Sequence, residues 1–345
     1  MKTSFPLLWG AMLALFCSSM LVSHAADVEV IVGNTVPNPG DAPPAGLNAP
    51  FAVDFDAQGA MIIVEYDGGR LLKWTAADGL ETLAGATATG YVDGAGETAR
   101  FNKLHNVTIG ADGQMYLSDH LNHAVRVYDP AKRSIDSFAG NGKEGFDGDS
   151  GSIDEARFRQ PICVSLTADR KQLLVADIGN RRIRQIDLAT ERVRTIAGNG
   201  KKGRPADGEL ATEAPLVDPR AAAAAPDGSW YLLERGGHVL RHVRDGRVTT
   251  VAGNGKPGLV DGPALSAQLN GPKHLDIASD GRVFIADDNN HAVRVYDPAT
   301  QTLQTVSTGN YKLKRPHGVK VHLGELYIAD SFHHRILKLA LPDAP

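Results

Sequence analysis

The chain has 345 residues, of which 36 are Lys or Arg and 40 are Asp or Glu, so its formal net charge is -4. A chain with an acidic balance has no electrostatic support for a nucleic-acid partner, which needs a basic surface. Length alone allows one large domain or two ordinary ones. The two cysteines, Cys17 and Cys163, lie far apart in the sequence.

The first 25 residues have the pattern of a secretory signal peptide. Lys2 gives a positive start, residues 7–22 are apolar, and a small residue, Ala25, stands where signal peptidase cleaves. A retained membrane anchor is the weaker alternative because the apolar run is short. We therefore expect a mature domain of residues 26–345, periplasmic or secreted and without a membrane span. It would keep one cysteine and form no internal disulfide.

One hairpin pattern recurs along the rest of the chain. In residues 107–129 an alternating apolar stretch reaches an Asp-Gly turn, a second strand ends in Asp119, and a third strand carries Arg126. The acid returns in five further units, as Glu65, Asp177, Glu234, Asp287 and Asp330. Fixed-period repeats of roughly 40–50 residues are typical of propeller blades. Because stacked units share one core, the repeats favour a single domain.

The N-terminal strand explains a gap in the last unit. Residues 27–34 are similar to 192–200 and 247–255, which are the fourth strands of their units. The last unit has only three strands, so we predict that residues 28–32 complete it and close a ring without open edges. The predicted fold is all-β, a six-bladed β-propeller of four-stranded antiparallel blades. Long inserts such as residues 140–160 precede each new blade and should gather on one face.

Two segments, 122–128 and 290–296, have the sequence Asn-His-Ala-Val-Arg-Val-Tyr and resemble the NHL repeat. Residues 316–319 and 327–330 resemble it too, and the Ala-Gly-Asn-Gly connectors resemble those of secreted bacterial NHL proteins. The resemblance covers essentially the whole mature chain, and it is weakest in the first and fourth blades. It implies a propeller but little about chemistry, because function depends on the site rather than the fold.

Residues that recur in most blades are expected to serve folding. Asp119 and Arg126 are seven residues apart, a spacing that can place opposite charges on adjacent strands of a hairpin. The same spacing recurs in three other blades, so we expect structural ion pairs rather than a ring of catalytic carboxylates. We expect the recurrent histidines to be turn and packing residues, namely His123, His291 and His334.

The residues at the start of each innermost strand differ from blade to blade. In chain order they are Phe51, His105, Ile162, Arg220, Lys273 and His317. The four titratable or cationic members, His105, Arg220, Lys273 and His317, are the predicted ligand-binding residues at the mouth of the channel. They suit a carboxylate or phosphate, with arginine forming a forked contact. The predicted role is therefore binding of a small anionic ligand, peptide or glycan, with no cofactor. The alternative is that these side chains only cap a water-filled channel.

Two enzymatic hypotheses compete with binding. The NHL-propeller lyase of peptide amidation is similar in fold, and the resemblance implies zinc held by three histidines. In a ring of six blades, blades 2, 4 and 6 lie at the corners of a triangle. Blades 2 and 6 supply His105 and His317, but blade 4 supplies Arg220. Blade 5 has His274, but alternation should turn this side chain to the other side of its strand. A divalent metal on His105 and His317 therefore stays the weaker alternative to no metal.

The second enzymatic hypothesis is a propeller lactonase, in which channel oxygens hold a divalent cation. Glu65, Asn106, Asp54 and Asp276 could supply such ligands, although no motif places them. A third hypothesis is a protein-protein scaffold that uses the Gly- and Asp-rich insert at residues 140–160. Cys163 has no motif-placed partner and is expected to be buried and inert.

Overall fold

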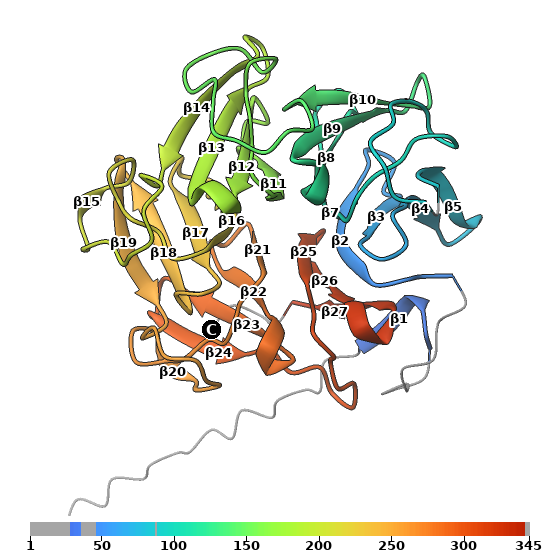
Figure 1. Cartoon of the computed structure of the whole chain (residues 1–345). Coiled ribbons are helices and arrows are strands. Elements are labelled where there is room, and N and C mark those ends of the chain that lie inside the picture. Colours follow the sequence, from blue (N-terminus) through green and yellow to red (C-terminus); the bar gives the residue numbers. More distant parts are fainter. Residues whose placement is uncertain (1–27, 36–45, 87, 342–345) are drawn as a thin grey trace, which may run out of the picture.

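The computed structural model describes residues 28–35, 46–86 and 88–341. Six small antiparallel sheets are arranged around a central axis (Figure 1). The predicted signal peptide, residues 1–25, lies outside the described residues. Within the described ranges, no helix is long and apolar enough to cross a membrane.

Each sheet is one blade, built from strands that follow one another in the chain. Blade 1 comprises β2 (Pro50–Phe55), β3 (Met61–Glu65), β4 (Leu71–Thr75) and β5 (Gly79–Ala84). Blade 2 comprises β7 (Leu104–Ile109), β8 (Met115–Asp119), β9 (Ala124–Asp129) and β10 (Ser134–Ala139). Blade 3 comprises β11 (Pro161–Leu166), β12 (Gln172–Asp177), β13 (Arg182–Asp187) and β14 (Arg192–Ala197).

The other three blades repeat this plan. Blade 4 comprises β16 (Pro219–Ala224), β17 (Trp230–Glu234), β18 (Val239–Arg244) and β19 (Arg247–Ala252). Blade 5 comprises β21 (His274–Ile277), β22 (Val283–Asp287), β23 (Ala292–Asp297) and β24 (Thr302–Thr305). Blade 6 comprises β25 (Gly318–His322), β26 (Glu325–Asp330), β27 (Arg335–Ala340) and β1 (Val28–Gly33). Four 3₁₀ turns join second strands to third strands: η1 (His120–Asn122), η2 (Ile178–Asn180), η3 (Asp288–Asn290) and η4 (Ser331–His333).

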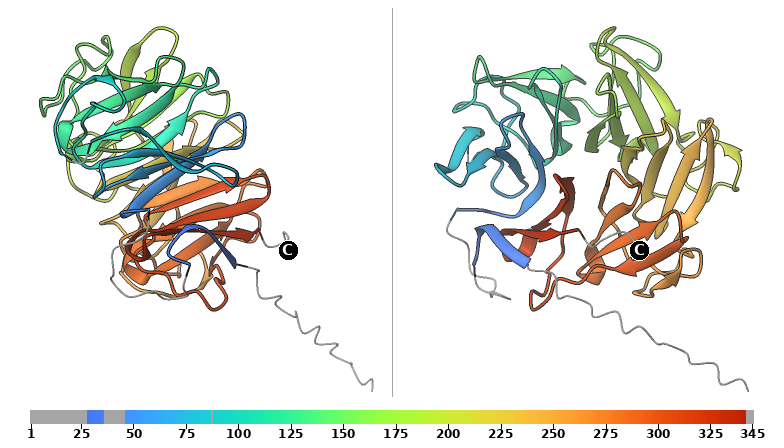
Figure 2. Two further views of the ribbon diagram at one scale, coloured as in Figure 1. Left: turned by 90° about the vertical axis from the view of Figure 1, so that its right-hand side faces the viewer. Right: turned by 180° about the vertical axis from the view of Figure 1, so that it is seen from behind.

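The predicted ring closure is confirmed. Strand β1 pairs antiparallel with β27, with Val28 opposite Leu339 and Val30 opposite Leu337. The two ends of the domain therefore share one sheet, which the views in Figure 2 show from the side and from behind. The six-bladed all-β fold expected from the sequence is thus the fold observed.

Three blades have five strands rather than the expected four. The additional strands are β6 (Gly94–Ala95), β15 (Glu209–Leu210) and β20 (Gly262–Pro263). Each lies in the insert that precedes its blade and pairs with the outermost strand of that blade. The inserts therefore also cover blade edges, where unpaired backbone groups would otherwise be exposed.

The recurrent acids fix the blades internally, as expected. Asp119 is fully buried and accepts hydrogen bonds from the backbone of Asn102 (2.8 Å) and from Arg126 (2.8 Å). Arg126 also contacts Asp93, which comes from the insert. Burial raises the pKa of Asp119 to about 6. Comparable acid–arginine pairs occur in the other blades: Glu65–Arg70, Asp177–Arg184, Glu234–Arg241, Asp287–Arg294 and Asp330–Arg335.

The recurrent histidines connect neighbouring blades. His123 has a left-handed backbone (φ 54°), and its Nδ1 accepts a hydrogen bond from the backbone of Gln160 in the next blade (3.1 Å). Three other histidines accept the corresponding hydrogen bond: His238, His291 and His334. The expectation that His123, His291 and His334 serve turns and packing is confirmed.

The glycine of the Ala-Gly-Asn connectors has a steric role. Gly198 has φ +89°, and a Cβ at this position would lie 2.1 Å from the carbonyl oxygen of Arg181. Only glycine lets the chain leave the fourth strand so close to the turn that joins the second and third strands of the same blade. The corresponding glycines of four other blades show the same close approach: Gly33, Gly85, Gly140 and Gly253.

Candidate functional site

The six predicted mouth residues lie together at one end of the channel, and all are buried. They stand where a β-bulge opens the innermost strand in blades 1 to 4, for example between Leu104 and Asn106. A bulge sets two residues against one on the partner strand. Both His105 and Asn106 can therefore face the axis, which simple alternation does not allow.

Arg220 crosses the mouth toward blade 2. Its Nη2 lies 2.9 Å from Nε2 of His105. Burial, and then the Arg220 charge, hold the pKa of His105 well below its usual range, so this neutral imidazole accepts the hydrogen bond. The Nε of Arg220 has no partner within the described residues. Burial also lowers the pKa of Arg220 to about 10. The guanidinium is thus a buried cation whose donors are only partly satisfied.

Lys273 and His317 form a second pair on the other side of the mouth. Lys273 Nζ lies 3.3 Å from His317 Nε2 and 3.7 Å from the carboxylate of Asp288. His317 Nδ1 donates to the carbonyl of Arg315 at 3.1 Å, which leaves Nε2 to accept. Burial, followed by the Arg220 charge, lowers the pKa of Lys273 to about 7. Asp288 is also bound by the Arg315 guanidinium at 2.8 Å, so two cations share one carboxylate.

An aromatic stack covers the third side. Phe51 stacks on His317 with ring centroids 3.8 Å apart and on Tyr66 at 4.3 Å, both at an interplanar angle of 10°. His105 meets the edge of the same ring at 5.0 Å. These rings hold the two histidines in place.

A hollow of about 250 Å³ opens beside Arg220. His120, Gln160 and Asp218 line it, together with Arg235, which pairs with Asp218 at 2.5 Å. Burial lowers the pKa of His120 to about 4, so this ring is neutral. The mouth thus holds four cations, Arg220, Arg235, Lys273 and Arg315, against the carboxylates Asp218 and Asp288.

Sequence reasoning missed several of these neighbours, although a signal for them exists. The residue that follows each recurrent acid also differs in every blade: Tyr66, His120, Ile178, Arg235, Asp288 and Ser331. This position lies in the turn between the second and third strands, beside the start of the innermost strand. These variable turn residues include Tyr66, which stacks on Phe51 at the mouth, and Asp288, whose carboxylate lies beside Lys273.

Below the mouth the channel is crossed by side chains. Asn106 Nδ2 lies 3.0 Å from His274 Nε2, which joins the opposite blades 2 and 5. The prediction that His274 turns away from the channel was wrong, because Lys273 and His274 both lie opposite Ala286 at the start of the strand. Further down, Lys320 lies 3.1 Å from Asp54 and 3.8 Å from Asp276.

No family model matches the chain. The chain is 25% identical over 351 residues to NHL repeat-containing protein 2 of Gallus gallus, an alignment that covers 87% of this chain and 47% of that protein. It is 28% identical over 276 residues to SUPPRESSOR OF QUENCHING 1, chloroplastic, of Arabidopsis thaliana, covering 60% of this chain and 26% of that protein. The chain is an NHL-repeat β-propeller. It spans about half the length, or less, of these curated relatives.

Solved structures with this fold have diverse descriptions. A structural genomics protein of unknown function from Bacteroides thetaiotaomicron matches with a TM-score of 0.64 and 18% identity, over 92% of this chain and 76% of that one. An auxiliary nutrient binding protein from Bacteroides ovatus matches with a TM-score of 0.63 and 14% identity, over 91% of this chain and 76% of that one. Virginiamycin B lyase from Staphylococcus aureus matches with a TM-score of 0.56 and 11% identity, over 92% of this chain and 100% of that one. At these identities the likeness shows the fold alone.

The candidate ligands of the two enzymatic hypotheses have other partners in the structure, and two of the lactonase candidates, Asp54 and Asp276, meet at Lys320. In the described part of the chain, no group of three or more His, Cys, Asp or Glu side chains is arranged to hold a metal ion. The Nε2 atoms of His105 and His317 face Arg220 and Lys273 instead. Glu65, a lactonase candidate, is paired with Arg70 inside its blade.

Two minor sequence features have structural roles in blade 3. Cys163 is buried, and burial raises the pKa of its thiol to about 12. The Asp- and Gly-rich stretch at residues 147–151 forms a turn that anchors the insert, because Asp149 accepts a hydrogen bond from the backbone of Thr195 (2.6 Å) and lies 3.4 Å from Arg184. Neither feature contributes to the mouth.

Proposed function

We propose that this propeller is a binding protein that captures a small anionic ligand, through carboxylate or phosphate oxygens, in the hollow beside Arg220. The observation that carries the proposal is the unpartnered Nε of Arg220, a side chain that is only 5% exposed. A buried donor without an acceptor is costly. An oxyanion in the hollow would meet the Arg220 guanidinium, and a rotation of this side chain would give Nε a charge-assisted hydrogen bond.

The charges around the hollow favour the same ligand class. Arg235 lines it, and Lys273 contributes to the same mouth. Because the pKa of Lys273 is lowered to about 7, a bound anion would draw a proton onto this amine and strengthen its own binding. The neutral His105 orients Arg220 without adding repulsion. A peptide or glycan that carries an acidic group could extend from the hollow across the insert loops.

The proposal agrees with one class of structural neighbours, the auxiliary nutrient binding proteins. We further infer from residues 1–25 that the domain is exported to the periplasm or secreted. N-terminal sequencing of the protein purified from its native host would find a chain that begins at residue 26. A chain that retains Met1 would contradict export by cleavage.

Thermal unfolding with added anions tests the binding site. Inorganic phosphate and succinate, added separately at pH 6.5, should raise the melting temperature of the wild-type protein, because a ligand at 100 times its dissociation constant adds about 2.7 kcal/mol. Arg220→Gln should remove most of the rise, since a hydrogen bond to a charged group contributes about 1.5–3 kcal/mol. Arg133→Gln, an exposed arginine paired with Glu81 on the outer surface, is the matched control. An equal rise in wild-type and Arg220→Gln proteins would refute the site.

A further inference from the structure

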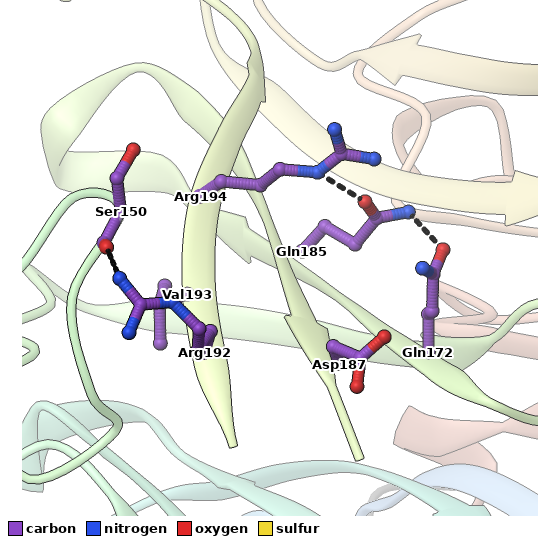
Figure 3. A pocket seen from close by; sticks show the side chains of 7 residues that line it. All are labelled: Ser150, Gln172, Gln185, Asp187, Arg192, Val193 and Arg194. Carbon is purple, nitrogen blue, oxygen red and sulfur yellow. Dashed lines mark hydrogen bonds between the residues drawn. The ribbon is translucent and has the colours of Figure 1, made fainter. Parts of the chain in front are cut away.

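A second groove lies at the opposite ends of the strands from the mouth, on the face of blade 3 toward blade 4. It consists of two adjoining hollows of about 320 and 440 Å³, which share Gln172, Gln185 and Arg194. Figure 3 shows these three side chains in a row across β12, β13 and β14. The larger hollow falls within the range of about 300–1,000 Å³ that is usual for small-molecule sites.

The row is ordered by its own hydrogen bonds. Arg194 Nε donates to Gln185 Oε1 at 2.7 Å, and Gln185 Nε2 donates to Gln172 Oε1 at 2.6 Å. The pKa of Asp187 is lowered, first by hydrogen bonds from Thr190 and also by one from Gln172. Donation thus runs in one direction, from the Arg194 guanidinium through Gln185 to Gln172, and fixes the orientation of the Gln185 amide.

The groove therefore presents mainly hydrogen-bond donors. Each amide oxygen already accepts a bond within the row, whereas Gln185 Nε2 uses one of its two N–H groups. In the described part of the chain, Arg194 has no carboxylate partner, and its terminal nitrogens make no hydrogen bond. Arg192, two residues earlier, turns away and donates to the Ser150 carbonyl (Figure 3). A ligand that fits this row must supply acceptors, with a carboxylate at Arg194.

The other blades show that this exposed cation is not required by the fold. In blade 6 the positions of Gln185 and Arg194 are taken by Lys338 and Glu29, which lie 3.3 Å apart. In blade 1 they are taken by Lys73 and Glu81, and Lys73 also lies 3.1 Å from Asp56. In blades 1 and 6 the cation at this level of the fold is thus matched by a carboxylate. Among the described residues, blade 3 instead combines two amides with an arginine that has no carboxylate partner.

The larger hollow also has an apolar, aromatic side. Trp230, at the start of β17, lines it and is partly exposed, and Leu174, Ile196 and Val243 line it as well. An aromatic side chain beside ordered amide and guanidinium donors suits a ring with an apolar face and many oxygen acceptors. Sugars have both properties, and sugars with a carboxylate would also engage Arg194.

We propose that this groove is a binding site for an acidic sugar of the hexuronate class. The ring lies against Trp230, its hydroxyl oxygens accept from Gln185 and Gln172, and its carboxylate binds the fork of Arg194. The site does not depend on the mouth, because the two share no residue. Loss of either site by mutation leaves the other intact.

Tryptophan fluorescence can report on this groove alone. The chain has three tryptophans, Trp9, Trp74 and Trp230, and Trp9 lies in the predicted signal peptide, so Trp74→Phe in residues 26–345 leaves Trp230 as the single reporter. Glucuronate should change its emission saturably, with a dissociation constant on the order of 1 mM or lower. Glucose lacks the carboxylate and acetate lacks the ring, so each should bind at least about tenfold more weakly. Isothermal titration of the unmodified protein with the same three compounds gives a second readout that needs no tryptophan replacement.

Two variants decide whether the groove is responsible. Arg194→Gln should weaken glucuronate binding at least about tenfold, because it removes a charge-assisted contact on an exposed side chain. Arg247→Gln is the control, since Arg247 lies on the outer strand of blade 4, donates to the Gly208 carbonyl and lines neither hollow. The proposal is overturned if glucuronate causes no saturable change or heat. It is also overturned if acetate binds equally well, or if Arg194→Gln binds like the wild type.

Discussion

Replacing Asp119 with alanine should cause one of the largest losses of stability that a single blade can show. Asp119 is fully buried and receives hydrogen bonds from the Asn102 backbone, the Asn122 side chain and Arg126, each at 2.8 Å. The variant leaves Arg126, also fully buried, with Asp93 as its remaining carboxylate. Breaking a buried pair from one side costs about 3–5 kcal/mol. Because Asp93 stays in place, we expect the lower end, about 3 kcal/mol.

The loss is measured as the change in free energy of unfolding from urea denaturation. The experiment is run at pH 8, because the pKa of Asp119 is raised to about 6 and its carboxylate must be charged. Asp136→Ala is the control, since Asp136 is an exposed acid on the outer strand of the same blade and should change stability by no more than about 0.5 kcal/mol. The double variant Asp119→Leu/Arg126→Leu removes both charges and should lose less than Asp119→Ala.

The double variant separates an ion-pair effect from a loss of packing. If Asp119→Ala differs from Asp136→Ala by less than about 1 kcal/mol, the recurrent acid does not hold the blade together. If the double variant is less stable than Asp119→Ala, the cost comes from lost contacts and not from an uncompensated Arg126. Either result would refute the structural role assigned to the repeated acids.

Three further predictions test the architecture and the electrostatics. Gly198→Ala should lose about 1–3 kcal/mol in urea unfolding, because its Cβ would meet the Arg181 carbonyl; unchanged stability would contradict the steric role of this glycine. Val30→Asp in β1 should lose a similar amount and weaken ring closure, because Val30 packs against the core of blade 6, and an unchanged denaturation midpoint would show that β1 is dispensable. Lys273→Met should stabilise the protein at pH 6 relative to wild type, and the advantage should shrink as pH rises from 7 to 10. In the folded wild-type protein the pKa of Lys273 is lowered to about 7. Between pH 7 and 10 the unfolded chain therefore binds a proton at Lys273 that the folded protein does not bind, and wild-type stability rises with pH. A pH-independent difference would show that Lys273 is not desolvated.

The blade pattern could be predicted from the sequence because each blade repeats the same local chemistry. The acid at Asp119, the arginine at Arg126 and the histidine at His123 recur at fixed spacing, and each serves a contact within a blade or between neighbours. The spare N-terminal strand could be placed because the last unit lacked one. The short strands β6, β15 and β20 could not be predicted, because a strand of two residues leaves no periodic signal in the sequence.

The composition of the mouth could be predicted but its contacts could not. Alternation with period two places one residue per pair toward the axis, and the bulges at the strand starts break that rule. His274 therefore faces Asn106 across the channel instead of turning away. The counter-charge from Asp288 comes from a turn in another part of the blade, and only the fold brings it to Lys273.

Calorimetric titration with inorganic phosphate at pH 8, in two buffers of different ionisation enthalpy, measures whether the mouth binds an anion and takes up a proton with it. We expect saturable binding with proton uptake, because the Lys273 amine, whose pKa is lowered to about 7, becomes charged beside the anion. Arg220→Gln should then bind at least about tenfold more weakly. Phosphate binding of equal strength in the two proteins, or no binding to the wild type at either pH 6.5 or pH 8, would contradict this expectation.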